Sequence, residues 1–178
     1  MKFLSFLFVI VLISACADLN KGGQIETIDA LSKTVDSVST VLIENNMDEI
    51  MTISREAHTV EKRITDNFDT DTIDFEFAKK MEAFKGVLNS FAPLQEMFLR
   101  LTNDSKTEKL ALIKLKNDIE NGNGDRAKYA EFVSFEQAKV KQICSLLAEY
   151  SELKKETVAT FQKLHTEIND YSLTFLPR

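Results

Sequence analysis

The chain has 178 residues, a formal net charge of −6 at pH 7, five glycines, two prolines and no tryptophan. This acidic balance argues against a nucleic-acid-binding protein and against a polybasic attachment to anionic lipids. The scarcity of helix-breaking residues, together with 44% hydrophobic residues, favours a globular protein built from long helices.

The first element is an apolar run over residues 3–13, directly after Lys2. A helix that crosses the hydrocarbon core of a membrane needs about 20 apolar residues, so this run is too short to be one. A basic residue followed by a short apolar stretch is typical of a secretory signal peptide. The run ends at Ile13-Ser14-Ala15-Cys16, and this ending indicates which kind of signal it is.

The tetrapeptide Ile13-Ser14-Ala15-Cys16 resembles the lipobox of bacterial lipoproteins, in which an aliphatic residue and two small residues precede an invariant cysteine. The resemblance covers the first 16 residues. It implies that residues 1–15 are a signal peptide and that the sulfur of Cys16 carries a diacylglycerol after cleavage. Two or more acyl chains hold a protein stably at a membrane. The alternatives are an ordinary cleaved signal with an incidental cysteine and an uncleaved anchor.

The resemblance also implies a location outside the cytoplasm, anchored in the cell membrane. In lipoproteins of Gram-negative bacteria, an aspartate directly after the cysteine often means retention in the inner membrane. Here Ala17 occupies that position and Asp18 follows it. The outer membrane is therefore favoured if the host is Gram-negative.

Loss of Lys2 with the signal makes the formal net charge −7, and the mature chain then has two cysteines, Cys16 and Cys144. If Cys16 is acylated, no intramolecular disulfide is possible. Cys144 is then expected to pack as a small apolar side chain. Residues 16–23 are predicted to be the lipidated cysteine and a tether, and residues 24–178 a single helical-bundle domain.

Hydrophobic residues at alternating spacings of three and four predict a first long helix over residues 25–67. The pair Asn45-Asn46 predicts a bend or break in it, because asparagine favours caps and turns. A second helix is predicted over 74–101, with a kink or restart at Pro93. Ser105-x-x-Glu108 has the form of a capping box. It predicts a short third helix over 106–120.

The sequence Asn-Gly-Asn-Gly at 121–124 predicts a turn, and a regular stripe predicts a last helix over 126–170. No strand pattern is present. The predicted fold is all-α, an elongated antiparallel helical bundle. It has four helices with a short third one, or three long legs if the second and third helices stack end to end.

Metal sites are not expected. Neither His58 nor His165 follows a glutamate by three residues, so the Glu-x-x-His motif of di-iron bundles is missing. The acidic segments 69–74 and 121–125 depart from the spacing and residue types of a calcium-binding loop, and we interpret them as turns and caps. No cofactor-binding or catalytic motif is present, so an enzyme is not expected either.

Four phenylalanines recur every seven residues in the predicted second helix, at Phe77, Phe84, Phe91 and Phe98. Such a stripe is typical of a core seam. It could also form a groove for an apolar ligand or a partner helix.

Together these patterns predict a lipid-anchored, non-catalytic component of the cell envelope, structural or engaged in protein–protein contacts. The expected partners are the membrane, through lipid on Cys16, and another protein or a second copy, through the helices. Nucleic acid is not an expected partner. The alternative is a helical module that carries a small apolar ligand along the seam from Phe77 to Phe98.

Overall fold

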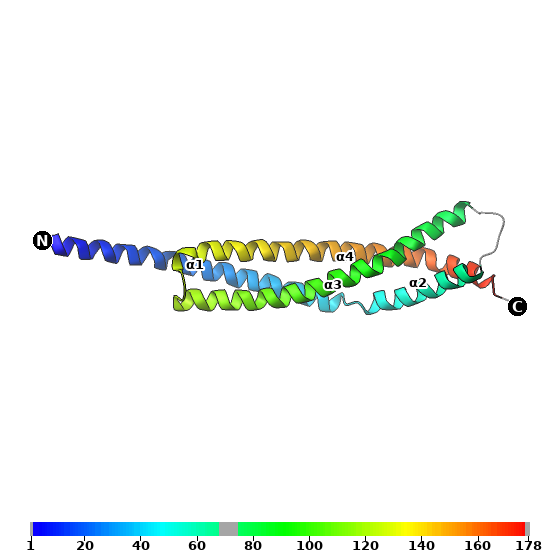
Figure 1. Cartoon of the computed structure of the whole chain (residues 1–178), viewed down its shortest axis with the longest axis horizontal. Helices are drawn as coiled ribbons and strands as arrows, with labels where there is room; N and C mark the ends of the chain where they lie inside the picture. Colours follow the sequence, from blue (N-terminus) through cyan, green and yellow to red (C-terminus); the bar gives the residue numbers. More distant parts are fainter. Residues whose placement is uncertain (1, 68–74, 177–178) are drawn as a thin grey trace. The chain divides into compact units, whose positions relative to one another are not determined.

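The computed structural model describes residues 2–67 and 75–176, without the side chains of residues 2–19. In chain order its elements are α1 (Lys2–Glu44), α2 (Asp48–Asn67), α3 (Phe75–Asn121), the 3-10 helix η1 (Arg126–Lys128) and α4 (Tyr129–Leu173) (Figure 1). The described residues form no strand, and the helices pack against one another. The predicted all-α helical bundle is confirmed.

The side chain of Cys16 and the rest of the lipobox lie outside the described side chains. Within the described part of the chain, no helix has both the length and the apolar character needed to cross a membrane.

The predicted break near residue 45 separates α1 from α2. Two residues of α4 bind the backbone at this break. The hydroxyl of Tyr150 donates a hydrogen bond to the carbonyl oxygen of Asn45 at 2.7 Å, and Nζ of Lys154 donates to that of Asn46 at 2.8 Å. These bonds satisfy carbonyl groups that the end of a helix leaves without an intrahelical donor.

The first helix was predicted to begin at residue 25, but residues 20–23, which were expected in the tether, already belong to α1. Glycine in a helix interior costs about 1 kcal/mol relative to alanine, which favoured a tether at Gly22-Gly23. Two tertiary interactions offset that cost. Nζ of Lys21 donates a hydrogen bond to the carbonyl oxygen of Glu120 at 2.8 Å, and Ile28 is fully buried.

The two helices predicted over 74–101 and 106–120 are one helix, α3. The version with a separate short third helix is therefore wrong, and the stacked alternative is confirmed. Ser105 and Glu108, expected to cap a helix, lie inside α3 and are buried. Pro93 also lies inside α3 without ending it. The hydroxyl of the buried Ser90, three residues before Pro93, donates a hydrogen bond to the carbonyl oxygen of Val87 at 2.6 Å.

A single stripe explains why α3 is continuous. Its positions alternate between spacings of three and four, the pattern of a helix face packed along a seam. Two of the positions, Ser105 and Glu108, are polar, and their local sequence is that of a cap rather than of a core. The complete stripe is Phe84, Val87, Phe91, Leu94, Phe98, Leu101, Ser105, Glu108, Leu112, Leu115 and Ile119.

The chain divides into two compact units. Unit 1 comprises Met1–Val41 and Thr102–Ser145, and unit 2 comprises Leu42–Leu101 and Leu146–Arg178. Helices α3 and α4 each contribute one segment to each unit.

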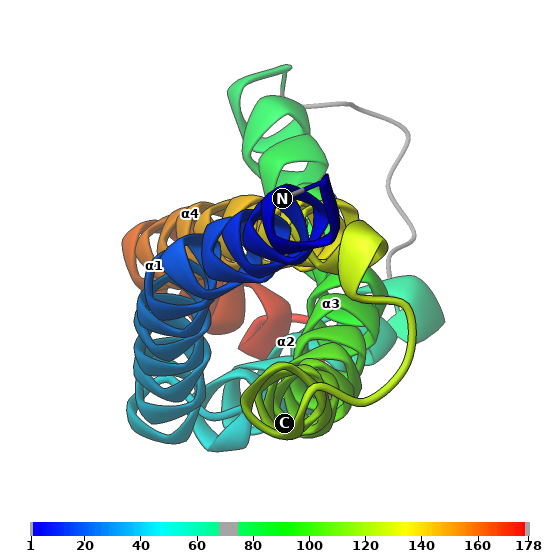
Figure 2. The ribbon, with the colours of Figure 1, turned by 90° about the vertical axis from the view of Figure 1, so that its left-hand side faces the viewer.

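Unit 1 is formed by α1, the second part of α3 and the first part of α4, which lie side by side in Figures 1 and 2. Lys116 pairs with Asp29 at 2.6 Å, and the hydroxyl of Tyr129 donates to the carbonyl oxygen of Asp118 at 2.9 Å. Its core draws on all three helices: Ile28, Val35, Leu112, Leu115, Ile119, Tyr129, Val133 and Val140.

Unit 2 is formed mainly by α2, the first part of α3 and the second part of α4. Helix α4 is joined to α2 by Arg63, whose Nη1 donates to Asn169 Oδ1 at 3.1 Å. It is joined to α3 by Thr157, whose hydroxyl donates to Ser90 Oγ at 2.8 Å between two buried side chains. The unit therefore has a polar contact between buried side chains of α3 and α4.

The predicted turn at 121–124 is confirmed and connects α3 to η1. Gly122 and Gly124 have φ angles of +67° and +81°, which non-glycine residues rarely adopt. Asp125 begins η1, and its carboxylate accepts a hydrogen bond from the backbone N–H of Ala127 at 3.1 Å. For residues 121–125, the interpretation as a turn and cap is confirmed.

Candidate functional site

The structure places the four phenylalanines of the predicted seam in unit 2, but at different depths. Phe84 and Phe91 are buried, whereas Phe77 and Phe98 are half-buried. The prediction of a core seam is therefore confirmed for the middle of the stripe and only partly at its two ends.

Each of these rings has an aromatic neighbour on another helix of unit 2. Three of the neighbours belong to α4 and one to α2. The ring centroids are 4.0 Å apart for Phe77–Tyr171, 6.3 Å for Phe84–Phe161, 5.8 Å for Phe91–His58 and 6.0 Å for Phe98–Tyr150. Aromatic pairs at these separations add about 0.5–1.5 kcal/mol to the burial of the rings themselves. The phenylalanines of the seven-residue repeat thus pack α3 against α2 and α4 in unit 2.

A groove of about 440 Å³ opens between α2 and α3 in unit 2. Phe91 and Phe98 line it, whereas Phe77 and Phe84 do not. This groove therefore includes one end of the predicted seam. Its other lining residues are Met47, Ile50, Met51, Ser54, Arg55, Gln95 and Leu99.

Two apolar side chains of the groove are open to solvent, Met51 at 64% exposure and Leu99 at 54%. Methionine is flexible and polarizable, and it is common on surfaces that bind partner helices. At the rim, the exposed Arg55 forms no ion pair with any described residue. The groove thus combines a soft apolar floor with an uncompensated positive charge.

The methionines of the groove were missed by sequence reasoning, which concentrated on the phenylalanines of α3. Met47 belongs to the apolar stripe of the first predicted helix, so part of the signal was present. Met51 lies beside that stripe and is exposed. Met51 lines the groove only because α3 lies beside it, and the sequence of α2 alone does not predict that arrangement.

Unit 1 holds a buried polar cluster between α3 and α4. Lys139 Nζ lies 2.9 Å from Glu108 Oε2 and 2.7 Å from Glu136 Oε2. Burial raises the pKa of Glu108 above its ordinary value, and the hydrogen bond from Lys139 only partly opposes this. Burial lowers the pKa of Lys139, but its hydrogen bonds to Glu136 and Glu108 outweigh that effect, so its pKa is raised. Glu108 Oε1 and the Ser105 hydroxyl have no hydrogen-bond partner among the described residues.

The histidines and Cys144 have ordinary structural surroundings. His58 Nδ1 lies 2.7 Å from the carbonyl oxygen of Ser54, and His165 stacks on Phe161 with the ring centroids 4.4 Å apart. Cys144, partly buried, packs against the core of unit 1, as predicted for a small apolar side chain. Within the described side chains, no three His, Cys, Asp or Glu residues lie close enough to hold a metal ion. The aspartates of 69–74 lie outside the described residues.

Comparison with protein families, curated proteins and solved structures finds no match for this chain.

Proposed function

We propose that this protein is a lipid-anchored, extracytoplasmic and non-catalytic interaction component of the cell envelope. Cys16 attaches it to the membrane, and the groove between α2 and α3 receives an amphipathic helix of a protein partner. The observation that carries the second part is the exposed apolar surface of Met51 and Leu99 beside the half-buried Phe98.

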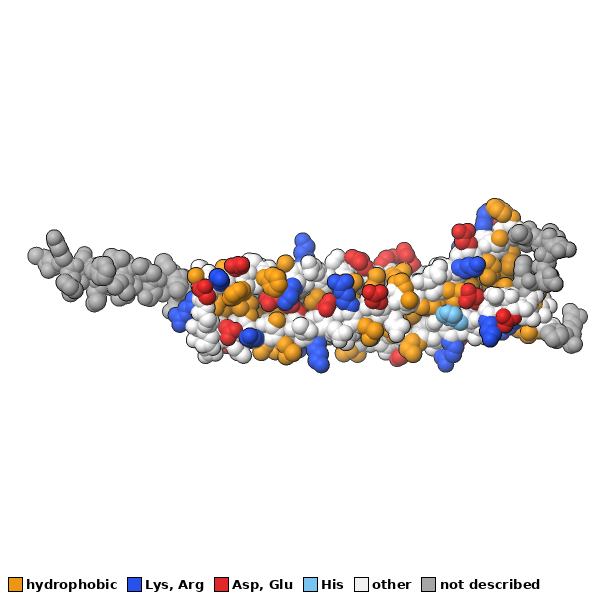
Figure 3. All heavy atoms as spheres, in the orientation of Figure 1, with side chains coloured by type: hydrophobic (Ala, Val, Ile, Leu, Met, Phe, Trp, Pro, Cys, Tyr) orange, Lys and Arg blue, Asp and Glu red, His pale blue; other side chains and the backbone are white. Residues whose placement is uncertain are grey.

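The anchor is supported by the spacing of the N-terminal residues. A single basic residue, an apolar run and Ile13-Ser14-Ala15-Cys16 follow one another in the order that lipoprotein signals require. A lipid anchor supplies membrane attachment without a basic surface. Figure 3 shows acidic and basic side chains interspersed on the visible face of the described residues.

The shape and charge of the groove support a helical occupant. Two neighbouring antiparallel helices leave a furrow in which the apolar face of a third helix packs, with its side chains at the i, i+3, i+4 and i+7 positions as anchors. Arg55 at the rim would pair with an acidic residue of that helix. The expected partner segment is therefore amphipathic, with a carboxylate next to its apolar face.

The alternative function is the transport or retention of a small apolar ligand in the same groove. The volume of about 440 Å³ lies within the range of about 300–1,000 Å³ that is usual for small-molecule pockets. The exposure of Met51 and Leu99 favours the helix, because a pocket that holds a small apolar ligand usually encloses most of its surface.

The anchor is tested by comparing wild type with Cys16→Ser in the source cells. We expect an intact mass that includes the acyl groups for wild type and its loss in the variant, with release of the variant from the membrane fraction. Equal membrane association of the two forms would contradict the anchor.

The groove is tested by a photo-crosslinking residue at Met51, with the exposed Lys62 on α2 as the matched control position. We expect a crosslink from position 51 to a helical segment of an envelope protein, abolished by Leu99→Glu and retained in Lys62→Glu. A crosslink to a second copy of the chain would contradict a separate partner. A small molecule in the native mass spectrum, lost in Leu99→Glu, would establish the alternative.

A further inference from the structure

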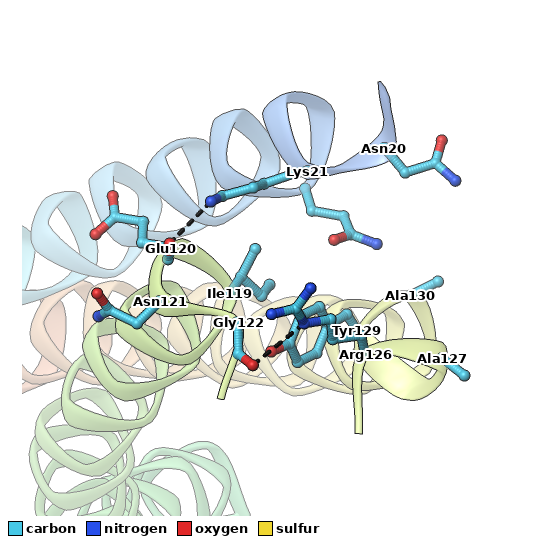
Figure 4. A pocket seen from close by; sticks show the side chains of 11 residues that line it. Asn20, Lys21, Ile119, Glu120, Asn121, Gly122, Arg126, Ala127, Tyr129 and Ala130 are labelled. Carbon is cyan, nitrogen blue, oxygen red and sulfur yellow. Dashed lines mark hydrogen bonds between the residues drawn. The ribbon is translucent and has the colours of Figure 1, made fainter. Parts of the chain in front are cut away.

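A second cavity, of about 660 Å³, lies at one end of unit 1. Its wall is formed by the beginning of the described side chains of α1 and by the segment that joins α3 to α4 (Figure 4). Neither the seam nor the groove of unit 2 includes any of its residues. Seven of its eleven lining residues carry a polar side-chain group, and none is a methionine, in contrast to the groove of unit 2.

Two cationic side chains approach this cavity from opposite walls, Lys21 from α1 and Arg126 from η1 (Figure 4). Each makes one hydrogen bond to a backbone carbonyl: Lys21 Nζ to Glu120 at 2.8 Å and Arg126 Nε to Gly122 at 3.2 Å. Neither forms an ion pair with a described residue. The remaining donors of Lys21 and both Nη groups of Arg126 are therefore available to a ligand.

The position of Arg126 depends on Gly122. A Cβ atom at residue 122 would lie 2.7 Å from Cζ and 2.9 Å from Nε of Arg126, far inside contact distance. The positive φ favours glycine at this position, and a Cβ there would push the exposed guanidinium of Arg126 out of its present place. With its Nε bonded to the Gly122 carbonyl, the guanidinium is held in place before any ligand arrives.

The nearby carboxylates among the described side chains do not neutralise these cations by direct contact. Glu120 lines the cavity, but in Figure 4 its carboxylate points away from Arg126. The charge of Glu120 instead acts on Lys116, where it is one of the influences that raise the pKa, the largest being the hydrogen bond to Asp29. Asp125 accepts a hydrogen bond from the backbone of Ala127.

Amide side chains extend the set of donors. Asn20 and Gln24 line the cavity from α1, one turn apart on the helix. An anion between Lys21 and Arg126 would therefore meet the amide donors of Asn20 and Gln24 on the α1 wall, beside the charged donor of Lys21. A phosphate group suits this arrangement, because it offers several acceptor oxygens and a guanidinium binds two of them side by side.

The cavity also lies close in sequence to the proposed anchor. Cys16 precedes Asn20 by four residues, a length of chain that spans at most about 14 Å when fully extended. If Cys16 carries a diacylglycerol, its glyceryl group lies at the level of the lipid headgroups. The cavity is then within reach of the layer in which phospholipid phosphates are concentrated.

We propose that the cavity between Lys21 and Arg126 binds a phosphate group, supplied by a phospholipid headgroup or by a free phosphate compound. For the lipid source, the proposal rests on the proposed anchoring at Cys16. Headgroup binding would hold this end of unit 1 against the membrane surface. The lipid anchor would then limit the distance of unit 1 from the membrane, and headgroup binding would fix its orientation.

The test uses the mature lipoprotein, purified from cells that express the full chain, in a maltoside detergent that contains no phosphate. Its arginine side chains are labelled with ¹⁵N, and the Arg126 signals are followed during titration. One arm adds inorganic phosphate, a second adds the soluble headgroup diester glycerophosphoglycerol, and a third compares bilayers of phosphatidylglycerol with bilayers of a neutral glycolipid.

A response to the diester and to phosphatidylglycerol, with a response to inorganic phosphate at least tenfold weaker, would identify the lipid headgroup. An equal or stronger response to inorganic phosphate would identify a free phosphate compound. Both outcomes support the phosphate site. No shift of the Arg126 signals in any arm would overturn it.

Matched variants separate specific binding from charge alone. Arg126→Gln and Lys21→Gln should each weaken binding about tenfold, because each removes a charge-assisted hydrogen bond. The controls are Lys114→Gln and Lys141→Gln, exposed positions of unit 1 with the same change of charge, which should leave the affinity unchanged. Equal weakening by controls and site variants would overturn the site. Because Gln at 126 removes the NMR reporter, the variants are compared by vesicle flotation and calorimetry.

The two proposals fail in different ways. An intact mass without acyl groups would refute the anchor, yet phosphate binding that depends on Arg126 would still stand in the detergent arms. A fully acylated protein whose binding ignores Lys21 and Arg126 would refute the site and leave the anchor intact.

Discussion

Lys139 Nζ lies 2.9 Å from Glu108 Oε2, and Glu108 is only 2% exposed. This ion pair stands at a position of the α3 stripe where an apolar residue would be expected. Removing one partner of a buried ion pair is destabilising, because the other charge stays buried without compensation. Because the pair requires an ionised Glu108, its contribution to the stability of unit 1 depends on pH.

Lys139→Met should destabilise the protein by about 2–3 kcal/mol at neutral pH, a value at the low end for buried pairs because Lys139 is partly exposed. The folded-state pKa of Glu108 is already above its unfolded value, first through burial. Its protonation therefore favours the folded state, an effect that is complete below the unfolded pKa and lost as pH rises through the folded pKa. Without Lys139 the folded pKa rises further.

The destabilisation caused by Lys139→Met should accordingly be largest near neutral pH and shrink as pH falls toward 4.5. Urea unfolding followed by circular dichroism at several pH values measures this. Lys141→Met, at an exposed position of the same helix, serves as the control. A loss of stability that is the same at all pH values would show that Glu108 does not carry the effect.

Thr157→Val should cost about 1 kcal/mol, because it removes the hydroxyl that donates to Ser90 Oγ at 2.8 Å in the core of unit 2. Thr157→Ser keeps the donor and isolates the loss of the methyl group. In a double-mutant cycle with Ser90→Ala, we expect a coupling energy of about 0.5–1.5 kcal/mol. Strict additivity of the two substitutions would contradict a direct hydrogen bond.

Phe84→Ala should destabilise unit 2 by about 3–5 kcal/mol, since the ring is fully buried and lies against Phe161. Phe75→Ala, nine residues earlier on the same helix, should change stability by less than about 0.5 kcal/mol, because Phe75 is 69% exposed. Thermal unfolding of both variants gives the comparison. Similar losses at the two positions would mean that α3 is rotated relative to the arrangement described.

Gly122→Ala should destabilise the protein more than Gly124→Ala. Both substitutions place a side chain at a positive φ, which costs about 1–2 kcal/mol. At Gly122 the new Cβ also displaces the end of the exposed Arg126 side chain, which loses its hydrogen bond to the Gly122 carbonyl, whereas the surroundings of Gly124 are open. Chemical denaturation measures the difference, and the reverse order would show that Arg126 does not occupy the space above Gly122.

Local sequence patterns predicted helix ends correctly where the residues at the end themselves favour a turn. Asn45-Asn46 interrupts a stripe with residues that favour turns, and Gly122 and Gly124 supply conformations that other residues avoid. The same reasoning failed at Ser105 and Glu108. Their cap-like spacing is also compatible with a helix interior when a neighbouring helix supplies a polar partner, and that partner, Lys139, is 31 residues away from Glu108.

The candidate groove shows the same division. The seven-residue repeat predicted that Phe91 and Phe98 share one helix face, but whether that face is core or groove depends on what α2 places beside it. Met51 completes the groove although it lies beside the apolar stripe of its own helix. The sequence likewise could not predict that Lys21 and Arg126 line the same cavity, because more than a hundred residues separate them.

The sequence by itself determined the all-helical class, the break near residue 45 and the turn at 121–124, and it predicts a lipobox at Cys16. These follow from local periodicity, backbone preference and motif spacing. Only the tertiary structure decided that α3 continues through Ser105 and Glu108, how deeply each phenylalanine is buried and which polar side chains meet. The physical reason is that burial and charge compensation depend on which residues the neighbouring helices contribute at the same level.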